Sequence, residues 1–157
     1  MKLNVRSWMS GVALASALLL SACGGGGGST GGGGGGAPAA LNVSTAGEQL
    51  QFAPGNLSAA PGDVKVTFKN GSGAQKHNWV LVKGGDDVAA KVDEAGVAAG
   101  DAKGYIPDDP NVLAHTKLVD GGGSDSISFK ADPGTYTFLC TFPGHYTAGM
   151  KGTLTVK

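Results

Sequence analysis

The chain has 157 residues, and its twelve basic and twelve acidic side chains give a formal net charge of zero. Its single arginine, Arg6, lies near the N-terminus and no stretch is strongly basic, which excludes a nucleic-acid-binding surface and a phosphate site built on arginine forks. This length supports one folded domain with a core of its own, in addition to the N-terminal segments described next.

Residues 1–22 are predicted to be a signal peptide, because Lys2 and Arg6 precede the short apolar run GVALASALLL. That run is too short to span a bilayer. The sequence Leu20–Cys23 resembles the lipobox of bacterial lipoproteins. The resemblance implies cleavage before Cys23 and acylation of Cys23, and hence attachment to a membrane through an N-terminal lipid. The alternative is an ordinary secretory signal followed by a chance cysteine.

Residues 23–39 are predicted to be the lipidated cysteine and a flexible linker, because residues 24–36 are all glycine apart from Ser29 and Thr30. The folded domain is then expected to span residues 40–157. We expect it to be a monomer outside the cytoplasm, in the periplasm or on the outer face of the cell membrane. Without the signal peptide the chain keeps ten lysines against twelve acidic residues.

Within the domain, alternating apolar and polar residues predict several short β-strands, and turn residues separate them. This pattern is typical of an all-β sandwich. In TYTFLC the alternation places Tyr136, Phe138 and Cys140 on one face, so the thiol should point inward. The segment NWVLVK is almost wholly apolar, as in a strand covered on both faces. The strands are expected around residues 64–68, 78–83, 125–129, 135–140 and 152–157.

Residues 84–112 interrupt this pattern, because they are rich in alanine and show no alternation. Asp86 or Asp87 could cap a short inserted helix that runs to about Ala99, with Val88, Val92 and Val97 on one side. Seven of the twelve acidic residues lie between positions 86 and 109, against two lysines. The insertion is therefore either a solvated flap or a docking surface for a cationic partner.

The last stretch, CTFPGHYTAGM, places Cys140, His145 and Met150 within eleven positions. If Cys23 is acylated, Cys140 is the only free thiol and has no disulfide partner in the chain. Thiolate, thioether and imidazole donors select copper or zinc over magnesium or calcium. A site with two histidines, one cysteine and a weak axial methionine is the blue-copper arrangement, and it needs either His77 or His115 as well.

The segments HNWVLV, AHTKLV and CTFPGHYTAGMKGTLTVK resemble the blue-copper cupredoxins, both the azurins and, more closely, the auracyanins. The resemblance covers residues 41–157. It implies a Greek-key, cupredoxin-like sandwich of about eight strands that binds one copper ion through His77, Cys140, His145 and Met150. His115 would then be a surface residue or a neighbour of the site. Azurins have a glycine where this chain has Lys76, so a fifth contact from that carbonyl is in doubt.

The resemblance also implies roles for residues beside the ligands. The backbone N–H groups of Asn78 and Phe142 would point at the Cys140 sulfur, and Asn78 would tie its strand to the loop at Thr141. Electrons would enter and leave through the exposed ring edge of His145.

We therefore expect a one-electron carrier that cycles between Cu(I) and Cu(II), and not an enzyme, because protein groups fill every ligand position. Its partners would be redox proteins such as cytochromes or a membrane electron-transfer complex, and no nucleic acid. The alternative is a copper-binding module for storage or delivery.

Overall fold

The computed structural model describes residues 37–157, which form nine strands, one α-helix and a short 3-10 helix. The elements are β1 Ala39–Ala46, β2 Gln49–Ala53, β3 Asn56–Ala59, β4 Gly62–Lys69, β5 Val80–Val82, α1 Asp86–Ala99, the 3-10 helix Asp101–Lys103, β6 Val112–His115, β7 Ser124–Ala131, β8 Gly134–Leu139 and β9 Lys151–Val156. The signal peptide and most of the glycine-rich linker lie outside the described residues, so both remain predictions.

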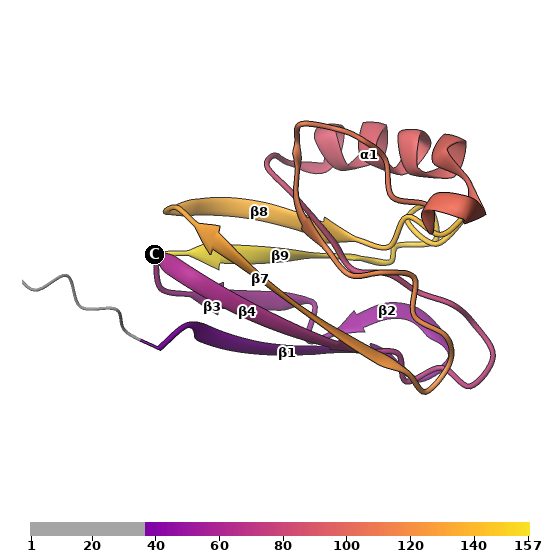
Figure 1. Cartoon of the computed structure of the whole chain (residues 1–157), viewed down its shortest axis with the longest axis horizontal. Helices are drawn as coiled ribbons and strands as arrows, with labels where there is room; N and C mark the ends of the chain where they lie inside the picture. The colour runs from indigo at the N-terminus through magenta and orange to yellow at the C-terminus, as the bar shows by residue number, and fades with distance from the viewer. Residues whose placement is uncertain (1–36) are drawn as a thin grey trace, which may run out of the picture. The chain divides into compact units, whose positions relative to one another are not determined.

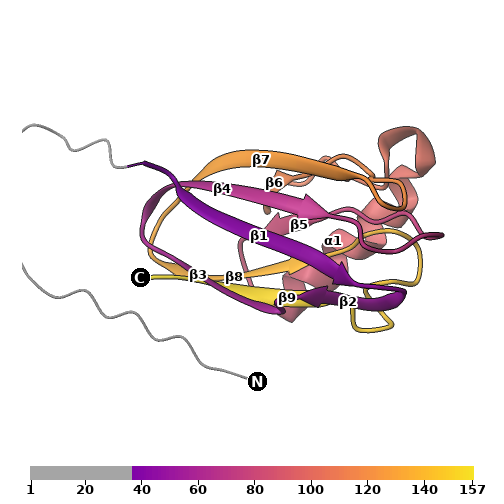
Figure 2. The same cartoon turned by 90° about the horizontal axis from the view of Figure 1, so that it is seen from below.

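The strands are divided between two mixed sheets that face each other (Figure 1). One sheet has the order β2-β1-β4-β7, and Figure 2 shows β1, β4 and β7 running along it. The other has the order β3-β9-β8-β5-β6. Because the chain crosses between the sheets repeatedly, its connectivity is that of the Greek-key sandwich expected from the sequence. The predicted all-β class with one inserted helix is confirmed, with nine strands among residues 37–157 instead of about eight.

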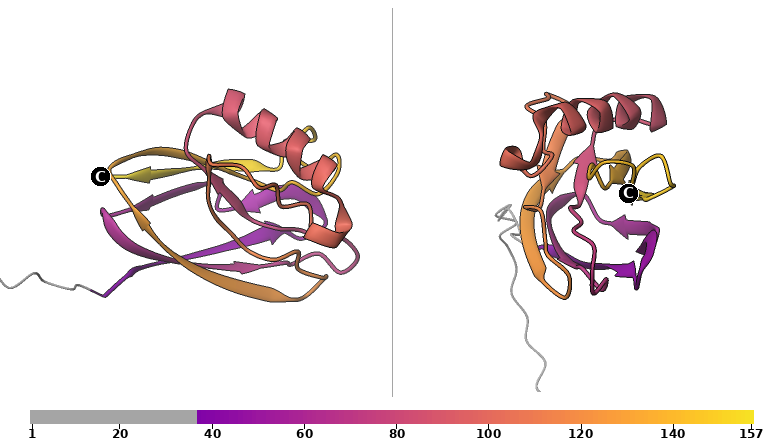
Figure 3. Two further views of the ribbon diagram at one scale, coloured as in Figure 1. Left: turned by 45° about the horizontal axis from the view of Figure 1, so that its top comes forward. Right: turned by 90° about the vertical axis from the view of Figure 1, so that its right-hand side faces the viewer.

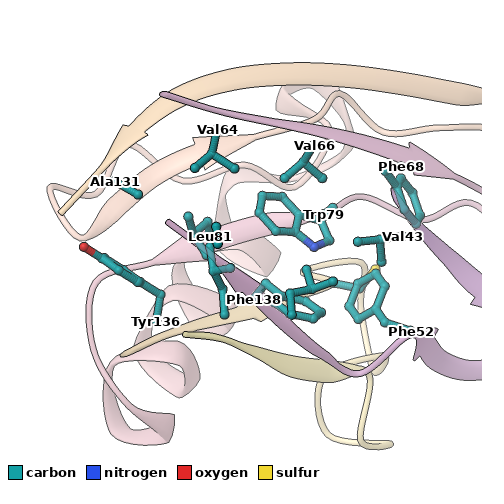
Figure 4. Packing of buried hydrophobic residues seen from close by; sticks show 14 of the residues in the cluster. Val43, Phe52, Val64, Val66, Phe68, Trp79, Leu81, Ala131, Tyr136 and Phe138 are labelled. Carbon is teal, nitrogen blue, oxygen red and sulfur yellow. The ribbon is translucent and has the colours of Figure 1, made fainter. Parts of the chain in front are cut away.

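The core lies between the sheets and follows from the period-2 alternation of the strands. Val64, Val66 and Phe68 on β4 are fully buried, whereas Lys65 between them is exposed. Figure 4 shows these side chains facing residues of the opposite sheet. The Phe138 ring on β8 packs against two other rings, 5.5 Å from Trp79 and 5.3 Å from Phe52 between centroids. These three rings therefore pack together in the core between the two sheets.

The helix α1 covers the outer face of the second sheet, as the views in Figures 1 and 3 show. Val80 and Val82 of β5 and Leu139 of β8 are buried beneath Ala89 and Val92 of the helix. Leu81 and Trp79, in contrast, belong to the core between the sheets. The segment around β5 is thus covered on both faces, as the apolar run predicted, although its paired residues are only Val80–Val82.

The predicted helix is confirmed, but two details of the prediction are wrong. Gly85 is the N-cap, and Asp86 and Asp87 lie in the first turn. There their negative charges interact favourably with the positive end of the helix dipole. Val97 is 42% exposed, and Gly96 is buried in its place. The buried positions follow the 3.6-residue period of a helix, which puts Gly96, not Val97, one turn beyond Val92.

No helix among residues 37–157 is long and apolar enough to cross a membrane.

Asp93 lies on the buried side of α1, where its carboxyl group makes the stability of the fold depend on pH. The side chain is 7% exposed, and its Oδ1 has no hydrogen-bond partner within residues 37–157. Burial, helped by the charge of Glu94, raises the pKa of Asp93 to about 6. The folded protein therefore favours the protonated acid, and this stabilisation is present below the ordinary pKa near 3.8 and lost as the pH rises through about 6.

Asp93→Asn should consequently raise the free energy of unfolding by about 2 kcal/mol at pH 7 and change it little at pH 4. Urea unfolding at both pH values measures the difference. Glu94→Gln is the matched control, because Glu94 is exposed on the same turn and is the lesser cause of the raised Asp93 pKa, so its pH-dependent gain should be much smaller. An equal effect of Asp93→Asn at both pH values would contradict the explanation.

Candidate metal centre

His77 is held at the mouth of the sandwich by the loop that precedes it. Its backbone pairs with Val119 in both directions, at 3.1 and 2.8 Å. The buried Asn70 side chain donates to the carbonyls of Gln75 and Val119 at 2.7 and 2.9 Å. At the outer end of the loop, the carboxylate of Glu48 accepts hydrogen bonds from Ser72 Oγ and Gly73 N, each at 2.6 Å. The backbone that carries the imidazole is therefore held in place by the protein itself.

Cys140 directly follows β8 and points into the core, as the alternation of TYTFLC predicted. Its N–H donates to the carbonyl of Met150 at 3.1 Å, so the loop between these residues closes on itself. Inside the loop, the N–H of His145 donates to Phe142 O and that of Met150 to His145 O, both at 3.0 Å. Gly149 has φ +100°, which a glycine adopts without steric cost. Tight turns thus return the chain to the start of β9.

These turns bring three donor atoms together at the separations that a metal ion needs. The Cys140 sulfur lies 3.5 Å from His145 Nδ1 and 3.8 Å from His77 Nδ1. All three donor atoms lie within 4.8 Å of one another, and all three residues are buried. Metal–sulfur and metal–nitrogen bonds of about 2.3 and 2.0–2.1 Å at trigonal to tetrahedral angles imply sulfur–nitrogen separations of about 3.5–3.8 Å. The cluster therefore fits one ion bound by two imidazoles and a thiolate.

Met150 supplies the fourth donor of the predicted set. Its side chain is fully buried in the same core cluster as Cys140, and its backbone bonds to both Cys140 and His145. A thioether beside a trigonal site of two histidines and a cysteine selects copper over harder ions. His77, Cys140, His145 and Met150 thus form a typical type 1 copper site.

The metal-free site holds little charge at neutral pH. Burial, together with the nearby His145, lowers the pKa of His77 to about 4, and burial also lowers the pKa of His145. Burial raises the pKa of the Cys140 thiol to about 11, against the effect of two backbone N–H donors. The two imidazoles are therefore neutral and ready to bind a metal, whereas the thiol must first lose its proton.

We expect copper binding at pH 7 to release about one proton per ion, since the bound form of cysteine is the thiolate. A pH indicator in weakly buffered solution, titrated with Cu(II), measures this stoichiometry. Zn(II) should release the same amount, because the proton comes from Cys140 whichever metal binds. Release of no proton would show that the thiol is already ionised or is not a ligand.

The three residues expected beside the ligands surround the sulfur. The backbone N–H groups of Asn78 and Phe142 donate to Cys140 Sγ. The Asn78 side chain bonds twice to Thr141, by accepting from Thr141 N at 2.9 Å and donating to Thr141 Oγ1 at 2.9 Å. The Phe142 ring lies 4.7 Å from that of His145 between centroids.

The remaining candidate residues lie elsewhere. His115 is exposed on β6 and is not part of the donor cluster. Cys23, the predicted lipidation site, lies outside the described residues. Sequence reasoning missed Glu48, Asn70 and Tyr105, whose roles depend on contacts between segments far apart in the chain. The lysine before the first ligand, Lys76, forms a surface ion pair with Asp120 at 3.1 Å.

A shallow pocket of about 400 Å³ lies over the exposed edge of the site. His145 is 6% exposed and reaches this pocket beside Phe142. The Tyr105 ring packs edge-on against Phe142, with centroids 5.1 Å apart. Lys76 and Asp101 lie at the rim, so the pocket floor is aromatic and its edge carries both signs of charge. His145 is the most exposed of the four donors, and it is the one that lines this pocket.

Comparisons with known proteins agree with this geometry. Residues 39–157 match the family described as copper binding proteins, plastocyanin/azurin family. The chain is 43% identical to auracyanin-A of Chloroflexus aurantiacus over the whole length of both. It is 50% identical to auracyanin-B of the same organism over 74% of this chain, and it spans only 51% of that relative's length. The crystal structure of dithionite-reduced auracyanin from Roseiflexus castenholzii superposes with a TM-score of 0.73 at 48% identity, covering 78% of this chain and 99% of that one.

Proposed function

Since the chain belongs to the plastocyanin/azurin family of copper-binding proteins, we propose that it is a type 1 blue-copper electron-transfer protein. The observation that carries this proposal is the buried cluster of His77, Cys140 and His145 with the buried Met150 beside it. When bound, copper supplies a one-electron couple between Cu(I) and Cu(II). No catalytic role is proposed, because four protein donors leave no position for a substrate or a water molecule.

The chain's own residues favour fast electron exchange. His77 comes from a loop that Asn70 and Glu48 fix, and the other three donors lie on one closed loop above an aromatic core. Such a site cannot rearrange much when the charge of the ion changes. With copper bound, the two N–H donors to the Cys140 thiolate, the Met150 thioether and the exclusion of water would all tune the reduction potential.

We further propose that electrons enter and leave at His145. Its imidazole is the only donor whose edge reaches the shallow aromatic pocket, and Phe142 and Tyr105 provide a flat apolar surface around it. A small contact of this kind suits a carrier that must release each partner quickly. The partners would be redox proteins such as cytochromes or a membrane electron-transfer complex, and the acidic insertion would favour those with a cationic surface.

Attachment to a membrane outside the cytoplasm is part of the same proposal. It is supported by the lipobox-like sequence at Cys23 and the glycine-rich segment after it. Mass spectrometry of the N-terminal peptide tests it, since cleavage before Cys23 leaves a terminal cysteine that carries acyl chains. An unmodified N-terminus elsewhere would contradict it.

Copper storage or delivery is the second candidate function, and a redox titration separates it from electron transfer. Adding Cu(II) to the metal-free chain should produce an intense blue thiolate-to-copper absorption. One-electron reductant should bleach the colour and oxidant should restore it over repeated cycles, with the copper still bound after gel filtration. Loss of copper on each reduction would favour storage or delivery and contradict our proposal.

A further inference from the structure

The inserted segment between β5 and β6 makes contacts with the metal loop that its description as a flap does not explain. Helix α1 ends at Ala99, and the chain then turns through the 3-10 helix into Gly104 and Tyr105. Both of these residues have left-handed backbones, with φ +58° and φ +60°. Tyr105 is the only residue other than glycine with positive φ within residues 37–157. A tyrosine in this region is uncommon, which indicates that the surroundings hold it there.

The carbonyls of this left-handed pair face the two residues that adjoin the first two ligands. Gly104 O accepts a hydrogen bond from Asn78 Nδ2 at 3.0 Å. Tyr105 O accepts one from Thr141 Oγ1 at 2.6 Å. The Thr141 hydroxyl thus donates to the insertion while it accepts from Asn78, and the Asn78 amide uses both of its N–H groups and its oxygen. Because Asn78 and Thr141 are fully buried, breaking one bond would leave a polar group unpaired.

The helix closes this network from above through Gly96. A Cβ atom at Gly96 would lie 2.6 Å from Tyr105 O and 2.9 Å from Thr141 Cβ. The helix backbone therefore touches both partners of the short hydrogen bond, at a distance that only glycine permits. The three atoms nearest to such a Cβ all belong to Tyr105 and Thr141, so we expect an added methyl group to act on the site through these two residues.

From these contacts we propose that the segment Gly96–Tyr105 is a clamp that positions the copper thiolate. By fixing Thr141 and the Asn78 side chain, the clamp keeps the N–H groups of Asn78 and Phe142 directed at Cys140 Sγ. This inference rests on the proposed copper function, and it adds a segment that sets the reduction potential of the copper site. Gly96 and Tyr105 act as positioning residues, and the insertion serves the site as well as covering the sheet.

Gly96→Ala in the full chain tests the clamp. The added methyl group must separate the helix from Thr141 and weaken the N–H bonds to the sulfur. Those bonds stabilise the electron-rich reduced site more than the oxidised one, so their loss should lower the reduction potential. We expect about a tenfold shift of the redox equilibrium towards Cu(II), which for one electron is about 59 mV. Val97→Ala, the next residue on the exposed face of α1, is the control and should leave the potential unchanged.

Amide hydrogen exchange in the metal-free chain provides a readout that does not depend on copper. In Gly96→Ala the amides of Asn78 and Phe142 should exchange about tenfold faster, the factor that corresponds to loss of a hydrogen bond. Unchanged exchange and an unchanged potential would overturn the clamp. If Gly96→Ala exchanges these amides faster but the parent chain does not turn blue with Cu(II), the result would support the clamp and contradict the copper function.

A second pair of variants keeps the test informative if Gly96→Ala does not fold. Thr141→Val removes the hydroxyl that bonds to Tyr105 O, whereas Thr141→Ser retains it. Thr141→Val should reproduce the lower reduction potential of Gly96→Ala. Thr141→Ser should have a reduction potential close to that of the parent protein. Equal potentials for the two variants would overturn the proposal, because the hydroxyl is the only direct hydrogen bond between Thr141 and the insertion among the described residues.

Discussion

Cys140→Ser will abolish the intense blue absorption of the copper-loaded protein. The colour comes from charge transfer between a thiolate and Cu(II), and a serine hydroxyl is neither ionised at neutral pH nor a soft donor. The substitution leaves His77, His145 and Met150 in place, so a weak, pale copper complex should remain. Visible absorption spectroscopy after stoichiometric addition of Cu(II) measures the loss, and the affinity should fall by several orders of magnitude.

Cys23→Ser is the matched control, since Cys23 is the only other cysteine in the chain and the sequence predicts it to be the lipidation site and not a copper ligand. It should keep the full blue absorption. A blue Cys140→Ser protein would mean that the thiolate is not the ligand, and the proposed function would then have no basis.

Gly152→Ala should cost more stability than any other single-methyl change considered for this fold, about 3 kcal/mol. Gly152 on β9 lies opposite Phe138 on β8. A Cβ atom there would fall well inside the van der Waals radii of the Phe138 ring and the Gly55 carbonyl oxygen. Phe138 cannot move aside, because Trp79 and Phe52 pack against it. Urea unfolding of the metal-free protein measures the loss as a lower midpoint.

The control for this prediction is Gly55→Ala. A Cβ atom at Gly55 meets its nearest neighbour at 3.7 Å, which is ordinary contact, and the backbone there is not left-handed. It should leave the unfolding midpoint nearly unchanged. Phe138→Leu in the Gly152→Ala background should recover part of the lost stability by making room. A Gly152→Ala protein as stable as the parent would show that β8 and β9 can separate at this pair.

The parts of the fold predicted from sequence are those in which local pattern and burial coincide. β4 alternates clearly because one of its faces is fully buried. β8 alternates in sequence only as far as Phe138, since Leu139 is buried on the other face beneath α1. β1, β2, β3 and β6 were not predicted. β2 and β3 have five and four residues, and β6 is a four-residue edge strand in which only alternate positions are partly buried. Strands of four or five residues form because the rest of the fold places them beside a neighbouring strand. Their sequences contain too few alternating positions to predict a strand.

The candidate site divides in the same way. Cys140, His145 and Met150 form a compact motif that the sequence displays directly. His77 was selected from the remaining histidines by family resemblance, since 63 positions separate it from the thiol. The contribution of Gly96 and Tyr105 left no signal that could be interpreted, because it arises from a backbone conformation and a close approach that only the folded chain reveals. A glycine inside a helix ordinarily weakens it, and here Gly96 is the residue that lets the helix approach the loop.

The position of the donors along the chain also determines when the centre can assemble. His77 lies near the middle, whereas the other three lie between Cys140 and the C-terminal Lys157, next to a strand that pairs with both β3 and β8. During synthesis the chain therefore has only one of the four donors until Cys140 has been added, and the set is complete only once Met150 has followed. Molecules that lack the stretch from Cys140 to Met150 keep a single donor and cannot hold the ion at this site, so every loaded molecule has that loop intact.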